Sequence, residues 1–278
     1  MSVIKRPTTA LLLAVAGAIV IALLLQLPHA PAQAPQAPPA LPSGTFVDLT
    51  HSFDSRAVYW PTARRFRLKE VAEGETDQGY YYAANDFSAA EHGGTHLDAP
   101  VHFARGRQTS DRIPLERLVG QAAVIDVTRA AAANRDYQVS VADFTTWERA
   151  NGTLPEGAIV LLRTGYSKFW PNRRRYMGTN ERGAEAVAKL HFPGLAPAAA
   201  RWLVANRRIK AIGLDTPSID YGQSKLFRSH RTLFAENIPA FENLDNLDRL
   251  PARGALFIGL PMKIRGGSGG PLRAIAII

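Results

Sequence analysis

Residues 91–103 read Glu-His-Gly-Gly-Thr-His-Leu-Asp-Ala-Pro-Val-His-Phe and contain three of the seven histidines in the chain. Two glycines and a proline argue against a helix over this stretch. In an extended strand alternate side chains leave on the same face, so His96 and Asp98 are expected to point together. The glycines allow the backbone to bend tightly enough to bring His92 to the same point. Two imidazoles and a carboxylate that converge in this way predict a divalent-metal site.

The alternative is that the histidines are structural polar groups that cluster by chance. His92, His96, Asp98 and His102 fall within one short segment interleaved with Gly and Pro, which favours metal binding over chance. Imidazole and carboxylate ligands suit zinc and manganese alike, so the sequence predicts one or two ions of either metal.

The composition of the 278-residue chain excludes several other kinds of site. It has no cysteine, which excludes thiolate zinc fingers, iron–sulfur clusters, disulfides and cysteine nucleophiles. The net charge is +9, but the basic residues are scattered and form no basic helix or aromatic-interleaved stripe. We therefore expect no nucleic-acid partner.

The first 44 residues are typical of an export signal followed by a tether. Lys5 and Arg6 precede an uncharged apolar run over 10–25, and an Ala-Pro-Ala exit follows at 30–32. This order predicts that residues 1–32 are a signal peptide, with an uncleaved inner-membrane anchor as the alternative. Residues 33–44 are rich in Pro and Ala and are expected to form an extended tether. The remainder would then be exported, to a bacterial periplasm.

Residues 45–278 are expected to form a single α/β domain with a mixed sheet. Short apolar, β-branched runs predict buried strands. A capping-box pattern predicts a helix that begins after Ser140, and a second helix is expected over 193–207. Asp215 and Asp220 are expected to fix a turn around Pro217. The glycine-rich loop over 266–270 is expected to be a tight structural loop or a subunit contact, with an anion site on its backbone amides as the alternative. The predicted strands are 122–127, 158–162, 209–214, 255–260 and 273–278.

The 91–103 stretch resembles the signature of the Putative cyclase family, which includes bacterial kynurenine formamidase and isatin hydrolase. Further similarity covers Asp-Leu-Thr-His-Ser at 48–52, Leu-Arg-Thr-Gly-Tyr at 162–166, Gly-Leu-Asp-Thr-Pro-Ser-Ile-Asp at 213–220 and the segments 259–261 and 266–271. The resemblance implies a cyclase-like (swivelling β/β/α) fold and a metal-dependent hydrolase.

The resemblance also implies a role for each matching residue. His92, His96 and Asp98 match metal ligands, and Asp98 matches an aspartate that can bridge two metals. His102 matches the histidine that donates and accepts the proton.

Three later residues match further family positions. His230 and Glu242, twelve apart, match ligands of a second metal. Trp60, in a Trp-Pro pair, matches a tryptophan that packs on the aromatic ring of the substrate, although Thr62 stands where glycine usually follows that pair.

A metal held by these ligands would lower the pKa of bound water from 15.7 to about 7 and supply hydroxide. His102, at its ordinary pKa of about 6.5, would shuttle the proton. We therefore expect an amidohydrolase that cleaves a non-peptide C–N bond in a small molecule, either an aryl formamide such as N-formylkynurenine or a cyclic amide. The alternatives are an exported metal- or solute-binding protein without catalysis, and a dehydratase or cyclase that uses the same site. The resemblance also favours a homo-oligomer.

Overall fold

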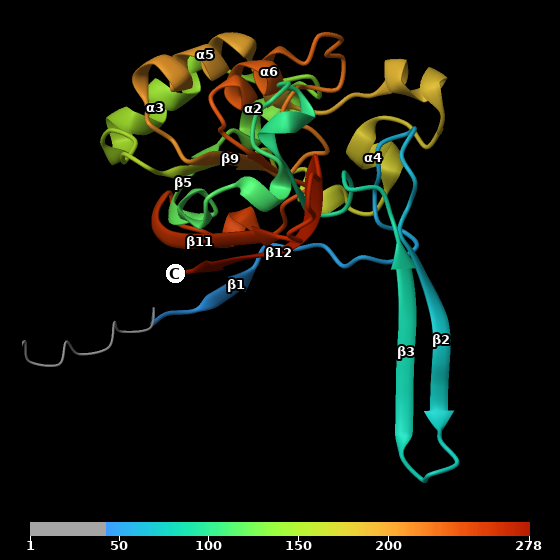
Figure 1. Cartoon of the computed structure of the whole chain (residues 1–278). Helices are drawn as coiled ribbons and strands as arrows, with labels where there is room; N and C mark the ends of the chain where they lie inside the picture. The colour runs from blue at the N-terminus through green and yellow to red at the C-terminus, as the bar shows by residue number, and fades with distance from the viewer. Residues whose placement is uncertain (1–42) are drawn as a thin grey trace, which may run out of the picture. The chain divides into compact units, whose positions relative to one another are not determined.

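The computed structural model describes residues 43–278, so the predicted signal peptide or anchor, and the tether as far as residue 42, lie outside the described residues. Within 43–278, no helix is both long and apolar enough to cross a bilayer. Strands and helices alternate over this range, which confirms the expected mixed α/β architecture (Figure 1).

The main sheet closes into a ring, which the sequence did not predict. Its strands follow the order β12-β11-β5-β7-β9-β10-β4, and β4 pairs with β12 to complete the circuit. The neighbours β5, β7, β9 and β10 are parallel, whereas the remaining pairs are antiparallel. Strand β1 pairs antiparallel with residues 275–277, at the C-terminal end of β12. Their bounds are β1 Phe46–Asp48, β4 His96–Asp98, β5 Val119–Asp126, β7 Ile159–Arg163, β9 Ala211–Leu214, β10 Ala240–Glu242, β11 Arg253–Pro261 and β12 Gly269–Ile277.

All five predicted strands are present, as β5, β7, β9, β11 and β12. Alternation along them separates two apolar cores. Every second side chain along a strand, such as Leu161 in β7 or Phe257 in β11, joins a core on the inner face of the closed sheet, and all the ring strands contribute to this core. The side chains between them, such as Val160 and Leu162 in β7, join a second core on the outer face together with residues of the helices.

Helices cover that outer face and lie together above the sheet (Figure 1). The capping box is confirmed at the first predicted helix, where the Asp143 carboxylate accepts hydrogen bonds from the backbone N–H of Ser140 at 2.7 Å and from its hydroxyl at 2.8 Å. The second predicted helix begins at Pro197 and not at Pro193, because residues 194–195 pair as a short strand. The helices are α2 Thr128–Ala133, α3 Val141–Asn151, α4 Arg173–Met177, α5 Pro197–Asn206 and α6 Arg228–Ala235, and the short strands are β6 Gln138–Val139 and β8 Gly194–Leu195.

A long hairpin leaves the body of the domain and was not predicted. Its strands β2 (Arg67–Glu75) and β3 (Tyr81–Ser88) pair only with each other among the described strands. Figure 1 shows the hairpin extending well away from the sheet and helices. We call residues 67–88 the arm.

Candidate metal centre

The short strands β4 and β10 place three of the predicted ligands. Leu97 packs in the inner core, so its neighbours His96 and Asp98 point to the outer face, as expected from their spacing. The antiparallel register sets Glu242 opposite His96, and Phe241, like Leu97, points inward. Consequently an imidazole and two carboxylates meet on one side of the sheet.

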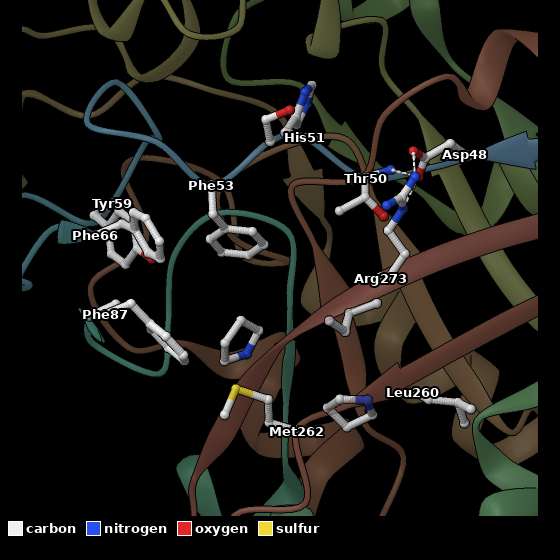
Figure 2. A pocket seen from close by; sticks show the side chains of 15 residues that line it. Asp48, Thr50, His51, Phe53, Tyr59, Phe66, Phe87, Leu260, Met262 and Arg273 are labelled. Carbon is white, nitrogen blue, oxygen red and sulfur yellow. Dashed lines mark hydrogen bonds and ion pairs between the residues drawn. The ribbon is translucent and has the colours of Figure 1, made fainter. Parts of the chain in front are cut away.

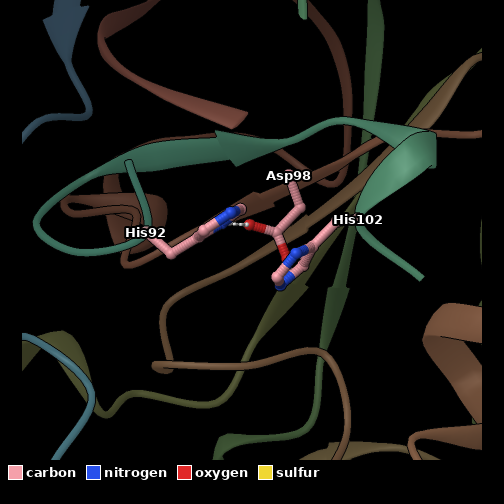
Figure 3. Close-up of side chains that lie close together, drawn as sticks. All are labelled: His92, Asp98 and His102. Atoms are coloured by element: carbon pink, nitrogen blue, oxygen red, sulfur yellow. Dashed lines mark hydrogen bonds and ion pairs between the residues drawn. The ribbon is translucent and has the colours of Figure 1, made fainter. Parts of the chain in front are cut away.

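The turn before β4 brings His92 to the same place. Gly94 has φ 62°, a left-handed conformation that favours glycine, and a side chain on Gly93 would collide with the ring of Tyr59. The chain can therefore turn tightly, and His92 Nδ1 lies 2.6 Å from Asp98 Oδ1 (Figure 3). The bend inferred from the glycines is confirmed.

The carboxylate of Asp98 is the centre of the cluster. It is 2% exposed, and imidazole nitrogens surround both of its oxygens. Its oxygens lie 2.6 Å from His92 Nδ1, 3.1 Å from His96 Nε2, 3.3 Å from His230 Nε2 and 4.0 Å from His102 Nε2.

His230 reaches the cluster from the first turn of α6. Asp220 accepts hydrogen bonds from the backbone N–H of Ser229 at 3.2 Å and of His230 at 3.1 Å, and it also lies 2.6 Å from His230 Nδ1. This contact directs the other ring nitrogen, Nε2, toward Glu242 Oε1 at 3.2 Å. Burial alone would lower the pKa of His230. The surrounding carboxylates outweigh burial and raise this pKa well above its usual value.

The donor set fits a divalent cation. His96 Nδ1 contacts the carbonyl oxygen of Gly94 at 2.9 Å, and its buried Nε2 faces Asp98 Oδ1 at 3.1 Å without a well-aligned hydrogen bond. Burial, and then the nearby Asp98 carboxylate, raise the pKa of Glu242, so a positive charge at this point would relieve an unfavourable arrangement. Ligand atoms lie within 4.8 Å of one another in two groups, His92–Asp98–His102 and His96–Asp98–Glu242.

A cavity of about 290 Å³ opens onto the cluster. His102 lines it from a short 3-10 turn, with its ring stacked on His92 at a centroid distance of 3.8 Å. Burial lowers the pKa of His102 to about 4, which corrects the ordinary value expected from the sequence. Aromatic walls complete the cavity, namely Trp60, Phe103 and Phe227.

Comparison with known proteins assigns the chain to a family. The family profile described as Putative cyclase matches residues 47–221. Isatin hydrolase from Roseibium aggregatum is 31% identical over 222 residues, which cover 77% of this chain and 81% of that protein. The chain belongs to the Putative cyclase family.

Two further cyclase-family members show the same relationship. Kynurenine formamidase from Salinibacter ruber is 27% identical over 229 residues, or 82% of this chain and 95% of that protein. The solved structure of isatin hydrolase A from Labrenzia aggregata superposes with a TM-score of 0.76 and 34% identity, covering 84% of this chain and 93% of that one.

The structure of this cyclase-family member also reveals polar residues whose contacts the sequence did not indicate. Asp215 accepts bonds from the backbone N–H groups of residues 164–166, as a structural residue would, but Asp220 contacts His230 and is more than a turn residue. Ser268, in the glycine-rich loop, lies 2.8 Å from His92 Nε2 and donates its hydroxyl to Glu91 at 2.5 Å. These partners come from distant segments, so no local motif marks them.

Proposed function

We propose that this chain hydrolyses a C–N bond outside peptide linkages, in an aryl formamide such as N-formylkynurenine or in a cyclic amide such as isatin. It is a metal-dependent hydrolase by family, and its relatives include isatin hydrolase and kynurenine formamidase. The observation that carries the proposal is the convergence of imidazoles on the buried Asp98 carboxylate, beneath a small cavity with aromatic walls.

The ligands fall into two sets that share one residue. His92, His96, Asp98, His230 and Glu242 would together hold one or two zinc or manganese ions, with the Asp98 carboxylate common to both groups. A cation bound there supplies a Lewis acid and lowers the pKa of water. Asp220 and Ser268, each bonded to one ligand imidazole, would orient the rings.

His102 would carry the proton. Its side chain is 29% exposed at the cavity, and Nε2 lies 4.0 Å from Asp98 Oδ2. Because its pKa is lowered to about 4, the imidazole is neutral near pH 7 and can accept a proton from the attacking water. Oxygen then bonds to the carbonyl carbon, the C–N bond breaks, and the same proton returns to the leaving nitrogen.

The aromatic walls would select the substrate. Trp60 lines the cavity with its ring edge-on to Phe192, at a centroid distance of 6.3 Å, and Phe103 lies beside His102. Flat aromatic substrates pack well on such surfaces. Isatin and N-formylkynurenine each carry a benzene ring beside the bond to be broken.

The cellular location remains part of the proposal. The basic start, apolar run and Ala-Pro-Ala exit of residues 1–32 support export to a periplasm, or anchoring in the inner membrane. An exported enzyme would meet its substrate outside the cytoplasm.

Turnover of both substrates by the purified chain tests the proposal. Hydrolysis should require metal, disappear after chelation, and return on reloading with zinc or manganese. Isatin should give one ring-opened product heavier than the substrate by one water, and N-formylkynurenine should give formate and a free aryl amine whose masses together exceed that of the substrate by one water. A product lighter by one water would instead indicate a dehydratase. Tight metal binding without turnover of either substrate would indicate a binding protein.

A further inference from the structure

The glycine-rich loop over 266–270 holds a serine between a ligand imidazole and a carboxylate. Ser268 Oγ lies 2.8 Å from His92 Nε2 and 2.5 Å from Glu91 Oε2, and the backbone N–H of Ser268 donates to the same carboxylate oxygen at 3.0 Å. The direct distance from His92 Nε2 to Glu91 Oε2 is 4.0 Å. Glu91 therefore reaches the imidazole through the serine hydroxyl.

The serine hydroxyl has a single proton, so the direction of each hydrogen bond in this series can be assigned. A carboxylate accepts hydrogen bonds and donates none, so the Ser268 hydroxyl proton points to Glu91. The lone pairs of Ser268 Oγ are then left for His92, and the 2.8 Å contact requires a hydrogen on Nε2. Nδ1, which lies 2.6 Å from Asp98 Oδ1 (Figure 3), is the ring nitrogen that remains for a cation.

Two other ligand imidazoles are held the opposite way round. His96 Nδ1 contacts the carbonyl oxygen of Gly94 at 2.9 Å, and His230 Nδ1 lies 2.6 Å from the Asp220 carboxylate. In both rings Nε2 faces the cluster. The orientation of a ligand imidazole is set by the partner of its other nitrogen, and for His92 that partner belongs to the glycine-rich loop.

The glycine-rich loop comes close to both partners because two of its positions carry no side chain. A Cβ at Gly269 would lie 2.7 Å from His92 Cε1, the ring carbon between the two nitrogens, and 2.5 Å from the carbonyl oxygen of Leu97. A Cβ at Gly267 would lie 2.9 Å from Glu91 Oε1. Glycine at these positions thus lets the serine between them reach the imidazole and the carboxylate together.

Backbone hydrogen bonds tie the same loop to the segment that follows β4. The carbonyl oxygen of Ser268 accepts from the N–H of Ala99 at 2.8 Å, and that of Gly267 accepts from the N–H of Ser110 at 2.9 Å. Ala99 directly follows Asp98 in the chain. The serine is therefore held at a fixed place relative to the central carboxylate of the cluster.

The turn after His92 is fixed by two aromatic rings. The ring of Tyr59 occupies the space where a side chain on Gly93 would lie, and that of Phe53 does the same at Gly94. Both rings also line a groove of about 710 Å³ (Figure 2). Because the backbone is held in this way, the hydrogen bonds of the imidazole decide which of its nitrogens faces the cluster.

We propose that Glu91 and Ser268 are positioning residues that keep a hydrogen on His92 Nε2. This imidazole then binds the cation through Nδ1, whereas His96 and His230 bind through Nε2. The inference rests on the proposed metal centre. It gives the glycine-rich loop, which the sequence analysis expected to be structural, a part in holding the metal.

Nitrogen NMR of the full chain with isotope-labelled histidine tests the assignment, in metal-free and in zinc-loaded protein. Correlations between the ring protons and the ring nitrogens distinguish a nitrogen that carries hydrogen from one that carries zinc or a free lone pair. The signals of His92 are identified by their loss in His92→Gln. His92 Nε2 should carry hydrogen in both states, and zinc should shift Nδ1 in His92 but Nε2 in His96 and His230.

Zinc affinity, measured by competition with a chelator, is a second readout. Ser268→Ala removes the acceptor for Nε2–H, and Glu91→Gln removes the charge that takes the hydroxyl proton, so each should raise the zinc dissociation constant about 10- to 100-fold. Ser268→Thr keeps the hydroxyl and should recover most of the affinity. Ser110→Ala, which loses a 3.1 Å hydrogen bond to the carbonyl of Met262, controls for loop packing, and Glu181→Gln at an exposed ion pair controls for charge. Both controls should bind zinc as the unmodified chain does.

Three results would overturn the proposal: no hydrogen on His92 Nε2 in the metal-free chain, zinc on that nitrogen in the loaded chain, or unchanged zinc affinity in Ser268→Ala and Glu91→Gln with native circular dichroism. The outcome is separable from that of the proposed function. Zinc held on Nδ1 without turnover of either substrate would support this inference and contradict the hydrolase proposal. Zinc held on Nε2 with normal turnover would do the reverse.

Discussion

Glu242 Oε2 lies 3.5 Å from His96 Nε2, across the ladder that joins β10 to β4. That nitrogen is buried and makes no well-aligned hydrogen bond, although Asp98 Oδ1 lies 3.1 Å away, and the two residues come from strands far apart in the sequence. The pairing register of two short strands thus places a carboxylate beside an imidazole lone pair, which is the arrangement that a cation needs.

Replacing the central carboxylate should abolish metal binding. Asp98→Asn removes the negative charge that faces four imidazoles, so the purified variant should retain little metal by mass spectrometry and show no turnover. Asp126→Asn, at an exposed ion pair with Arg163, is the matched control and should keep both metal and activity. Full occupancy in Asp98→Asn would contradict the assignment of the site.

Replacing the proton carrier should separate chemistry from metal binding. His102→Gln should keep most of the metal and lose about 10²- to 10⁴-fold in kcat, the usual contribution of a positioned acid–base group. Because His102 also lies within ligand distance of His92 and Asp98, metal content must be measured beside the rate. Metal loss in this variant would make His102 a ligand.

The contact between Asp220 and His230 should tune metal affinity. Asp220→Asn weakens the bond that orients the imidazole, so the metal dissociation constant should rise about 10- to 100-fold. The 2.7 Å pair of Asp136 with His191 lies outside the cluster, and Asp136→Asn should leave metal affinity unchanged. Equal affinity in both variants would mean that Asp220 serves only to hold the start of α6.

Metal uptake should release protons. The pKa of His230 is raised well above 6.5 in the metal-free chain, so its ring is protonated near pH 7, and a cation that takes Nε2 displaces that proton. Affinity should therefore increase with pH, by about ten-fold per unit for each proton released, until the pH exceeds that pKa. Calorimetry in buffers of different ionisation enthalpy counts the protons, and a count of zero would contradict the raised pKa.

Shortening the aromatic wall should affect binding more than chemistry. Trp60→Ala removes a ring from the cavity lining and should raise KM about two- to ten-fold with kcat little changed. Trp60→Phe should recover part of the loss. An unchanged KM for aromatic substrates would place the ring of the substrate elsewhere.

Much of the site could be predicted because its ligands lie in one short segment. The shared face of His96 and Asp98 follows from strand geometry, and the bend that returns His92 follows from Gly93 and Gly94. His230 and Glu242 join the cluster through the pairing of β10 with β4 and the position of α6, and only the family resemblance indicated them in the sequence.

The fold shows the same division between local and distant information. Continuous apolar runs marked the buried strands of the ring, but ring closure depends on β4 pairing with β12, which no local pattern encodes. The arm was missed because its strands carry charged and apolar residues without a buried face. Burial shifted the pKa of His102, and burial is a property of the assembled fold.

The pairing of β4 with both β10 and β12 makes the chain slow to acquire its ligand set. Loop-closure entropy penalises contacts between distant segments, and folds dominated by such contacts form in milliseconds to seconds, more slowly than helical ones. While the chain is being synthesised, residues 91–103 are present long before Glu242 and the loop around Ser268. A nascent chain therefore offers a few histidines and one aspartate, and the full coordination environment appears only when the downstream strands close the ring.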